Sequence, residues 1–257
     1  MSKLKNKIAL ITGGTSGIGK ATAVDFIEQG ATVIITGRHQ STVDETVKEL
    51  GNNAKGIVAD SSNIADLKEL AEKIKALTGK VDVLFVNAGY GKFAPIEMID
   101  EAHFDEQFNV LVKGTLFTVQ SILPLMGEGS SIVLNTSIVT EKGMQGASVY
   151  SAAKSAVQSF VKTFASELSS RKIRLNAVSP GPIETAFFDK TGMNEEQIQG
   201  FAGAVLPQVP MARFGKSSEV AKAVTFLASD DASYMHGTEF LLMAEWFNFK
   251  NLKNNKR

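Results

Sequence analysis

The sequence predicts an α/β fold in which about seven parallel strands form one doubly wound sheet with helices on both faces. Short β-rich apolar runs recur along the chain and alternate with longer segments of helical periodicity. Most of these runs are apolar throughout, which is typical of parallel strands that helices cover on both sides. A glycine-rich turn follows the first run and leads directly into a helix.

The individual elements follow from these patterns in chain order. Runs of isoleucine, valine, leucine and threonine favour extended backbone, and they predict strands over residues 8–11, 32–36, 56–59, 81–86, 131–134, 173–178 and 239–242. The segments between them are long enough for crossover helices and repeat their apolar residues at helical spacing. They predict helices over residues 17–29, 64–77, 100–126, 148–170 and 217–228.

No linker, internal repeat or low-complexity stretch divides the chain, so we expect one domain over residues 1–242. The segment that follows residue 180 is rich in Gly, Pro and Phe and is too long for an ordinary connection. We interpret residues 182–212 as a lid over a substrate site. Residues 243–257 form an atypical tail that ends rich in Lys and Asn.

The composition excludes several classes of function. Lys plus Arg and Asp plus Glu number 27 each, so no global field favours nucleic acid or an anionic membrane. Cysteine is absent, which excludes disulfides and thiolate nucleophiles and favours a reducing cytoplasm. No signal segment precedes the first strand, and no apolar run approaches the ~20 residues that span a bilayer. The histidines His39, His103 and His236 lack ligand spacing, so we expect no metal site.

The turn after the first strand is the first candidate binding site. Glycine there permits positive φ and close approach of a ligand, while the helix N-terminus offers unpaired N–H groups to a pyrophosphate. An isolated glycine cluster can also be an ordinary tight turn. Its place in the first β–α turn of a doubly wound sheet favours a dinucleotide. The candidate ligands are Gly13, Thr15, Ser16, Gly17, Ile18 and Gly19.

The end of the second predicted strand indicates which dinucleotide binds. An acidic residue there would accept hydrogen bonds from a free 2′-hydroxyl, whereas an arginine can accommodate a 2′-phosphate. This strand ends in Thr36-Gly37-Arg38-His39, without an acid. Arg38 can offer a forked donor to a phosphate, with His39 beside it. We therefore expect NADP(H) rather than NAD(H), although a solvated surface arginine remains the alternative.

A tyrosine, a lysine and a serine form the candidate catalytic group. Tyr150 and Lys154 are four residues apart at the start of a predicted helix, so they share one face. A nearby cation favours the phenolate and makes tyrosine a usable acid or base near neutral pH. By itself this spacing also fits a partly exposed surface pair. Ser137 follows a strand at the carboxyl edge, where such sheets bind ligands, and can donate to a developing oxyanion.

Together these motifs resemble the short-chain dehydrogenase/reductase family, in its common branch of about this length. The resemblance covers residues 5 to about 242 and implies a single-domain Rossmann-like fold. It rests on Thr12-Gly13 with Gly17 and Gly19, Asp60, Asn87-Ala88-Gly89, Asn109, Ser137, Tyr150 with Lys154, and Pro180-Gly181 with Thr185. In that family the Gly37-Arg38 pair resembles an NADP-preferring pattern.

The resemblance also implies roles for these residues. Tyr150 would be the general acid/base, Lys154 would lower its pKa and bind the nicotinamide ribose, and Ser137 would hold the substrate oxygen. Asn109 would hold a water that links Lys154 to solvent. The remaining cofactor contacts would come from Asp60, Ser61, Asn87, Ala88, Gly89, Pro180, Gly181, Ile183 and Thr185. Each of three residues has a structural alternative: Asn109 as a satisfied polar group in a helix, Asp60 as a helix N-cap or turn residue, and Asn87 as a strand-end turn former.

The C-terminus departs from the family pattern. Asp-Gly-Gly usually follows the last strand, whereas this chain continues Leu242-Met243-Ala244-Glu245-Trp246-Phe247. A shift of one reading frame would restore Asp-Gly-Gly-Met, so we hypothesise a frameshifted ending. The family is usually tetrameric, and this end commonly packs at subunit interfaces. We expect a homo-oligomer, either a tetramer or a dimer, although exposed aromatic residues, Trp246, Phe247 and Phe249, could alternatively cover a neighbouring subunit or the cleft.

The substrate is expected to be a small hydrophobic ketone or aldehyde that NADPH reduces reversibly. An apolar wall is predicted from Tyr90, Phe93, Met144, Ala186, Phe187, Phe188, Met193, Phe201 and Val205. A reductase of 3-oxoacyl groups on acyl carrier protein is one alternative, although no basic cluster marks a carrier dock. A non-catalytic dinucleotide-binding sensor is the other. The second Asn that often precedes Asn87 is Val86 here, which we expect to alter packing only.

Overall fold

The computed structural model describes residues 2–185 and 195–243. Seven strands form one parallel sheet in the order β3-β2-β1-β4-β5-β6-β9, so the predicted doubly wound sheet is confirmed. The strands are β1 (Ile8–Ile11), β2 (Thr32–Gly37), β3 (Ala54–Val58), β4 (Val83–Val86), β5 (Ser131–Asn135), β6 (Arg174–Pro180) and β9 (Glu239–Leu242). The chain starts in the middle of the sheet, moves to one edge and then crosses to the other, which leaves a switch point between β1 and β4.

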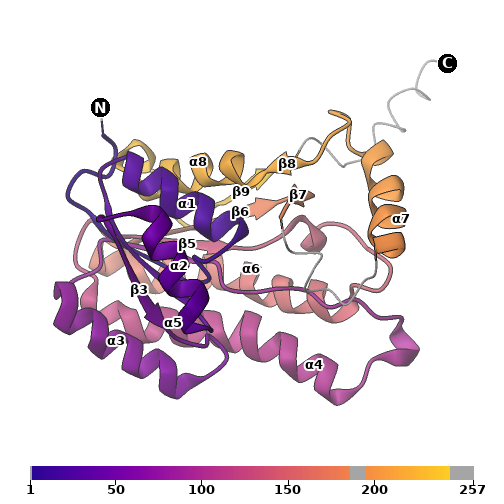
Figure 1. Cartoon of the computed structure of the whole chain (residues 1–257), viewed down its shortest axis with the longest axis horizontal. Coiled ribbons are helices and arrows are strands. Elements are labelled where there is room, and N and C mark those ends of the chain that lie inside the picture. Colours follow the sequence, from indigo (N-terminus) through magenta and orange to yellow (C-terminus); the bar gives the residue numbers. More distant parts are fainter. Residues whose placement is uncertain (1, 186–194, 244–257) are drawn as a thin grey trace.

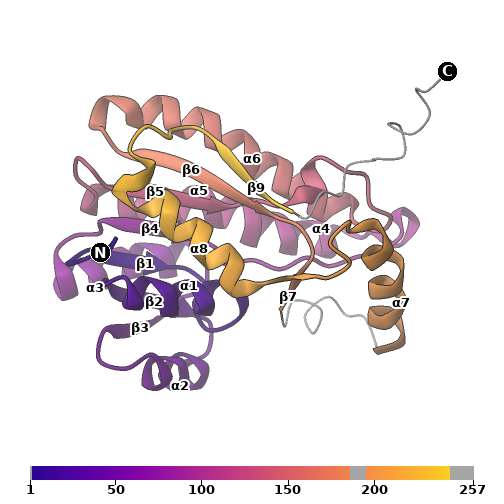
Figure 2. The ribbon, with the colours of Figure 1, turned by 90° about the horizontal axis from the view of Figure 1, so that it is seen from above.

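Helices cover both faces of this sheet (Figures 1 and 2). One layer contains α1 (Gly17–Glu28), α2 (Gln40–Leu50) and α8 (Ser217–Ala228), and the other contains α3 (Ile64–Thr78), α4 (Glu101–Phe108), α5 (Gly114–Ile122) and α6 (Ser148–Leu168). Alternation along β1 shows why both layers are needed. Ala9 and Ile11 pack in the core under α1 and α8, whereas Leu10 packs in the core under α3, α5 and α6.

One predicted helix is wrong as a continuous element. The segment 100–126 divides into α4, a π-helical turn over Asn109–Lys113, α5, and a 3₁₀ turn over Leu123–Leu125. In the π-helical turn, the N–H of Gly114 donates to the carbonyl of Asn109, a spacing of five residues. Periodicity alone could not place this turn, because one inserted residue hardly changes the apolar pattern. The helix α2 was also not among the predicted segments.

By length and mean hydropathy alone, one helical stretch of the described chain, Glu101–Leu125, could cross a membrane. In the fold this stretch is α4, the π-helical turn, α5 and the 3₁₀ turn, and it packs against α3 and α6. The core helix of a globular protein satisfies the same test, so the stretch by itself is weak evidence for a span.

Within the segment 182–212 the structure describes β7 (Ile183–Glu184), α7 (Glu195–Val205) and a 3₁₀ turn over Leu206–Gln208. β7 pairs in parallel with β8 (Gly215–Lys216), which follows the segment. Residues of the predicted apolar wall at 186, 187, 188 and 193 lie outside the described residues, as does the side chain of Phe201. The tail from residue 244 also lies outside them, so the frameshift hypothesis and the roles of its aromatic residues stay predictions.

Candidate active site

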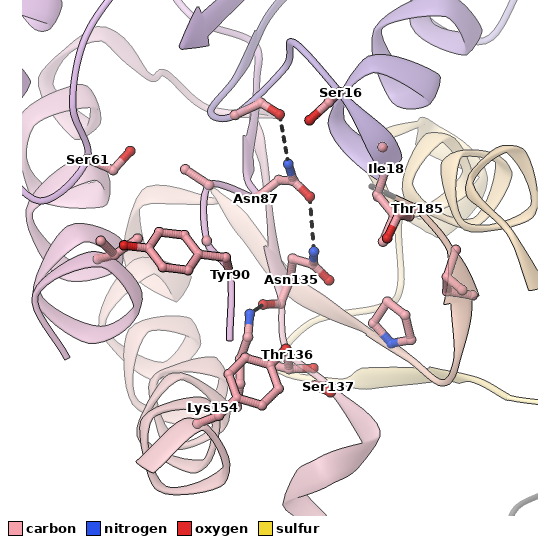
Figure 3. Close-up of a pocket in the computed structure, with 18 of the residues that line it drawn as sticks. Ser16, Ile18, Ser61, Asn87, Tyr90, Asn135, Thr136, Ser137, Lys154 and Thr185 are labelled. Carbon is pink, nitrogen blue, oxygen red and sulfur yellow. Dashed lines mark hydrogen bonds between the residues drawn. The ribbon is translucent and has the colours of Figure 1, made fainter. Parts of the chain in front are cut away.

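A cleft opens at the carboxyl edge of the sheet, where the turns after several strands meet (Figure 3). Most of the predicted ligands line it: Gly13, Thr15, Ser16, Gly17, Ile18, Arg38, Asp60, Ser61, Asn87, Ala88, Gly89, Ser137, Tyr150, Lys154, Pro180, Gly181, Ile183 and Thr185. Gly19, His39 and Asn109 are predicted ligands that do not line it. The structure thus brings segments from residue 13 to residue 185 to one edge, as a doubly wound sheet does.

The glycine-rich turn has the backbone that a bound diphosphate requires. Gly13 and Gly17 have φ angles of 64° and 52°, which favour glycine. Ser16, the residue before α1, makes no side-chain capping bond, and the first turn of α1 carries no acid. The N-terminus of α1 therefore keeps its positive end and its N–H groups available for an anion. This geometry fits the diphosphate of a dinucleotide.

Gly19 lies at a close approach between the glycine-rich turn and the residue that follows β4. A Cβ built on it would lie 2.2 Å from the carbonyl oxygen of Gly13 and 2.7 Å from Nδ2 of Asn87. The same Asn87 nitrogen donates to the carbonyls of Thr12 and Gly13 at 3.1 Å each. Gly19 thus lets the side chain that follows β4 reach the turn that follows β1, and its predicted contact with cofactor stays a prediction.

Asn135 is a cleft residue that the sequence analysis missed. It ends β5, its Nδ2 donates to Oδ1 of Asn87 at 3.0 Å (Figure 3), and its own Oδ1 is buried without a hydrogen-bond partner. Its main-chain carbonyl accepts a bond from Nζ of Lys154 at 2.6 Å. An asparagine at the end of a buried strand was the available signal. Its two contacts make Asn135 the link between the glycine-rich turn and the catalytic lysine.

At the end of the cleft away from Ser137 and Lys154, the lining residues are Arg38, Asp60, Ser61 and Tyr90. Asp60 also accepts bonds from the main-chain N–H and the hydroxyl of Ser62 at 2.8 Å each, so it stabilises its own turn as the structural alternative predicted. His39 precedes α2 as its N-cap residue and is not among the residues that line the cleft, so its predicted contact with cofactor stays a prediction.

Tyr90 also differs from its predicted place. Its aromatic ring predicts a place in the apolar substrate wall, but the guanidinium carbon of Arg38 lies 5.6 Å from the centroid of that ring. Figure 3 shows Tyr90 on the Ser61 side of the cleft, across from Thr185. An aromatic side chain predicts a hydrophobic contact, whereas in the structure the ring of Tyr90 lies near Arg38 and its hydroxyl bonds to Glu106.

At the opposite end of the cleft, Tyr150 lies together with Ser137 and Lys154. Tyr150 and Lys154 are 8% and 6% exposed, and Nζ of Lys154 lies 6.0 Å from the centroid of the Tyr150 ring. The hydroxyl of Ser137 hydrogen-bonds to the phenol oxygen. Helix α6 positions the phenol and the amine on one face, and the turn after β5 brings the serine to them. The predicted catalytic side chains therefore meet in a site from which water is largely excluded.

Burial sets the protonation of this group. It raises the pKa of Tyr150 to about 12, and the hydrogen bond from Ser137 opposes that rise. Burial also lowers the pKa of Lys154 to about 8. Both shifts favour the neutral form, because a charged group loses hydration in the cleft. The direction is opposite to the expected fall in the phenol pKa beside Lys154, and Tyr150 carries its proton at neutral pH.

The shift at Lys154 predicts a specific pH dependence of stability. Between pH 8 and 10.5 the unfolded state binds a proton that the folded state has released, so burial of Lys154 costs less stability as pH rises through this window. We expect the free energy of unfolding, relative to Lys154→Met, to increase by about 3 kcal/mol from pH 7 to pH 11. Urea unfolding of both proteins across this range measures it. A constant difference between wild type and variant would contradict the buried-amine assignment.

Asn109 lies at the start of the π-helical turn, away from the cleft lining. Its Oδ1 is 3.5 Å from Nζ of Lys113, one turn along the helix. The π-helical turn contacts α6, the helix that carries Lys154, and the water-mediated link to Lys154 that the resemblance implies stays a prediction.

The substrate end of the cleft is apolar. Phe93 meets the ring of Tyr150 edge-on, with centroids 6.0 Å apart and planes at 66°. Met144 and Phe93 pack against the cluster that contains Tyr150 and Val139. The predicted wall is therefore present in part at Phe93 and Met144. Val205 is buried but is not among the lining residues.

The family model described as "Enoyl-(Acyl carrier protein) reductase" matches residues 13–242. The chain is similar to 3-oxoacyl-[acyl-carrier-protein] reductase FabG of Thermotoga maritima, with 38% identity over 91% of this chain and 95% of the relative. It is similar to NADPH-dependent aldehyde reductase 1, chloroplastic, of Arabidopsis thaliana, with 35% identity over 90% of this chain and 83% of the relative.

Among solved structures, the fold is similar to a short-chain dehydrogenase/reductase from Brucella melitensis described as a glucose/ribitol dehydrogenase. The TM-score is 0.86 with 27% identity, over 96% of this chain and 98% of the other.

Proposed function

The chain belongs to the short-chain dehydrogenase/reductase family of oxidoreductases, which use the dinucleotides NAD(P)(H), and on this premise we propose that it is an NADPH-dependent reductase of a ketone or aldehyde. The reaction is reversible, so the same site oxidises the alcohol. The observation that carries the proposal is the buried contact of Tyr150 with Ser137, beside Lys154, at the apolar end of the cleft. A carbonyl oxygen placed there meets two hydroxyl donors.

The chain's own residues perform the proton transfer and the alignment. The bound nicotinamide cofactor would supply the hydride. Tyr150 donates its proton to the substrate oxygen as the carbonyl carbon accepts that hydride, so an alcohol forms and the phenol becomes a phenolate. Ser137 stabilises the charge that develops on the oxygen. Lys154 favours the phenolate when it is protonated, and it is held in place by the carbonyl of Asn135.

The remaining lining residues support binding and orientation in this proposal. The glycine-rich turn and the N-terminus of α1 hold the diphosphate, Asp60 and Ser61 border the adenine, and Pro180, Gly181, Ile183 and Thr185 border the nicotinamide. Phe93 and Met144 exclude water from the substrate end.

Arg38 supports the choice of NADPH. It follows β2, lines the adenosine end of the cleft, and can bind a 2′-phosphate through two donors. We expect Arg38→Gln to raise the Kd for NADPH about 10- to 100-fold and to change the Kd for NADH less than threefold. Titration of cofactor fluorescence measures both constants. The matched control is Lys55→Gln, which removes an exposed positive charge from β3 and should change neither; equal loss for both cofactors in Arg38→Gln would contradict NADP selectivity.

A panel of carbonyl compounds tests the proposal as a whole. Small hydrophobic ketones and aldehydes are assayed in parallel with NADPH and NADH, and we expect turnover with NADPH. The panel includes 3-oxoacyl groups on acyl carrier protein, because 38% identity to a 3-oxoacyl reductase favours that second candidate. Binding of NADPH without reduction of any compound would favour the sensor alternative instead.

A homo-oligomer in the cytoplasm is part of this proposal. The absence of cysteine and the balanced charge support a reducing compartment without a nucleic-acid or membrane partner. Sedimentation of the purified protein at several concentrations measures the oligomeric state, and a monomer at every concentration would contradict it.

A further inference from the structure

We propose that Tyr90 is a positioning residue for cofactor selectivity, because its ring holds the guanidinium of Arg38 at the adenosine end of the cleft, where a 2′-phosphate would bind. The inference rests on the proposed use of NADPH. It concerns a residue outside the glycine-rich turn and outside the catalytic group.

The guanidinium of Arg38 is in contact with the ring of Tyr90. Arg38 follows β2 and Tyr90 follows β4, so the two residues are brought together only by the order of strands in the sheet. The guanidinium carbon lies 5.6 Å from the ring centroid, within the range of a cation–π interaction. Both residues line the cleft. A surface arginine without such a contact must lose rotamer freedom when a phosphate binds, and the ring of Tyr90 reduces that loss.

Hydrogen bonds to α4 fix the position of Tyr90. Its hydroxyl donates to Oε1 of Glu106 on α4, and Nζ of Lys92 donates to Oε2 of the same carboxylate. The main-chain N–H of Lys92 also donates to Oε1 of Gln107 at 3.0 Å. The loop that carries Tyr90 is therefore bound to α4 at three points. These bonds hold the ring of Tyr90 in one orientation.

The surroundings of Tyr90 keep its phenol in the neutral form. Burial, the hydrogen bond to Glu106 and the charge of Glu106 raise the pKa of Tyr90 to about 12, and Arg38 opposes the rise. The phenol is therefore neutral and brings no negative charge next to a phosphate. Hydrogen bonds from Lys92 and Tyr90 lower the pKa of Glu106, which stays ionised and paired with Lys92. The positive charge of Arg38 is thus left available to a ligand.

The experiment isolates the adenosine end by using probes without nicotinamide. Adenosine 2′,5′-bisphosphate carries the 2′-phosphate, and adenosine 5′-monophosphate lacks it. We expect Tyr90→Leu to weaken binding of the bisphosphate about three- to tenfold and to change binding of the monophosphate less than twofold, as measured by calorimetry. Tyr90→Phe keeps the ring but loses the hydroxyl that bonds to Glu106 and to Arg38, so its effect should be smaller than that of Tyr90→Leu.

A double-mutant cycle tests whether Tyr90 acts through Arg38. In an Arg38→Gln background, Tyr90→Leu should change binding of the bisphosphate less than twofold, because the group that Tyr90 positions is gone. Phe104→Leu, an exposed aromatic substitution on α4 outside the cleft lining, is the control for disturbance of that helix and should leave both probes unaffected.

The outcomes separate the inference from the proposed function. If wild type binds the two probes equally, the proposed NADPH dependence is wrong. If wild type prefers the bisphosphate and Arg38→Gln removes that preference while Tyr90→Leu does not change it, the proposed function stands and the role of Tyr90 is overturned. An equal loss of both probes in Tyr90→Leu also overturns it, because Tyr90 would then act on adenine binding or folding.

Discussion

Replacing Tyr150 by Phe should lower kcat for carbonyl reduction by about 10²- to 10⁴-fold and leave the Kd for the nicotinamide cofactor within a few-fold of wild type. The substitution removes one oxygen atom from a residue that is 8% exposed and keeps the ring that packs edge-on against Phe93. The fold should therefore persist, while the proton that the substrate oxygen needs is no longer supplied. The pKa of about 12 means that wild-type Tyr150 carries this proton at every pH used for assay.

Steady-state kinetics and cofactor titration on the same preparation measure the two quantities. The matched control is Tyr234→Phe, which removes the hydroxyl from a fully exposed tyrosine and should change neither. Ser137→Ala should lower kcat by a smaller factor, about 10- to 100-fold, because it removes one donor to the oxygen and leaves the acid in place. Retention of wild-type kcat in Tyr150→Phe would falsify the assignment of Tyr150 as the acid.

Replacing Gly19 by Ala should cause the largest loss of stability, about 2–4 kcal/mol, together with at least a tenfold loss of cofactor affinity. Helix propensity alone favours alanine over glycine by about 1 kcal/mol, so the expected sign is opposite to the local preference. The new Cβ would lie 2.2 Å from the carbonyl oxygen of Gly13 and 2.7 Å from Nδ2 of Asn87. Either the glycine-rich turn or Asn87 must therefore move, although hydrogen bonds join the two.

Urea unfolding and cofactor titration measure this pair of effects. Gly127→Ala is the control, since Gly127 is exposed, has nothing within 4 Å of its built Cβ, and lies outside the cleft. It should change the free energy of unfolding by less than about 0.5 kcal/mol. Wild-type stability in Gly19→Ala would show that the contact between the turn and β4 is looser than the distances indicate.

Much of the fold was predictable because its signals are local. The strands over Ile8–Ile11 and Glu239–Leu242 and the helix over Ser217–Ala228 have the predicted bounds. Each is fixed by the composition and periodicity of its own residues. The glycine-rich turn and the pair Tyr150 and Lys154 are local in the same sense, since short spacings place them on one turn or one helix face. The break in the segment 100–126 was missed because a π-helical turn leaves little trace in an apolar pattern.

The sequence by itself determined most of the chemical groups that the cleft contains, because strand ends in a doubly wound sheet share one edge. Only the tertiary structure decided how those groups act on one another. The contact of Arg38 with Tyr90, the bond from Asn135 to Asn87, and the clash that reserves position 19 for glycine all join residues far apart in the chain. Burial then reversed the expected direction of the Tyr150 pKa shift. Such distances and burial depend on packing between elements, which local spacing does not encode.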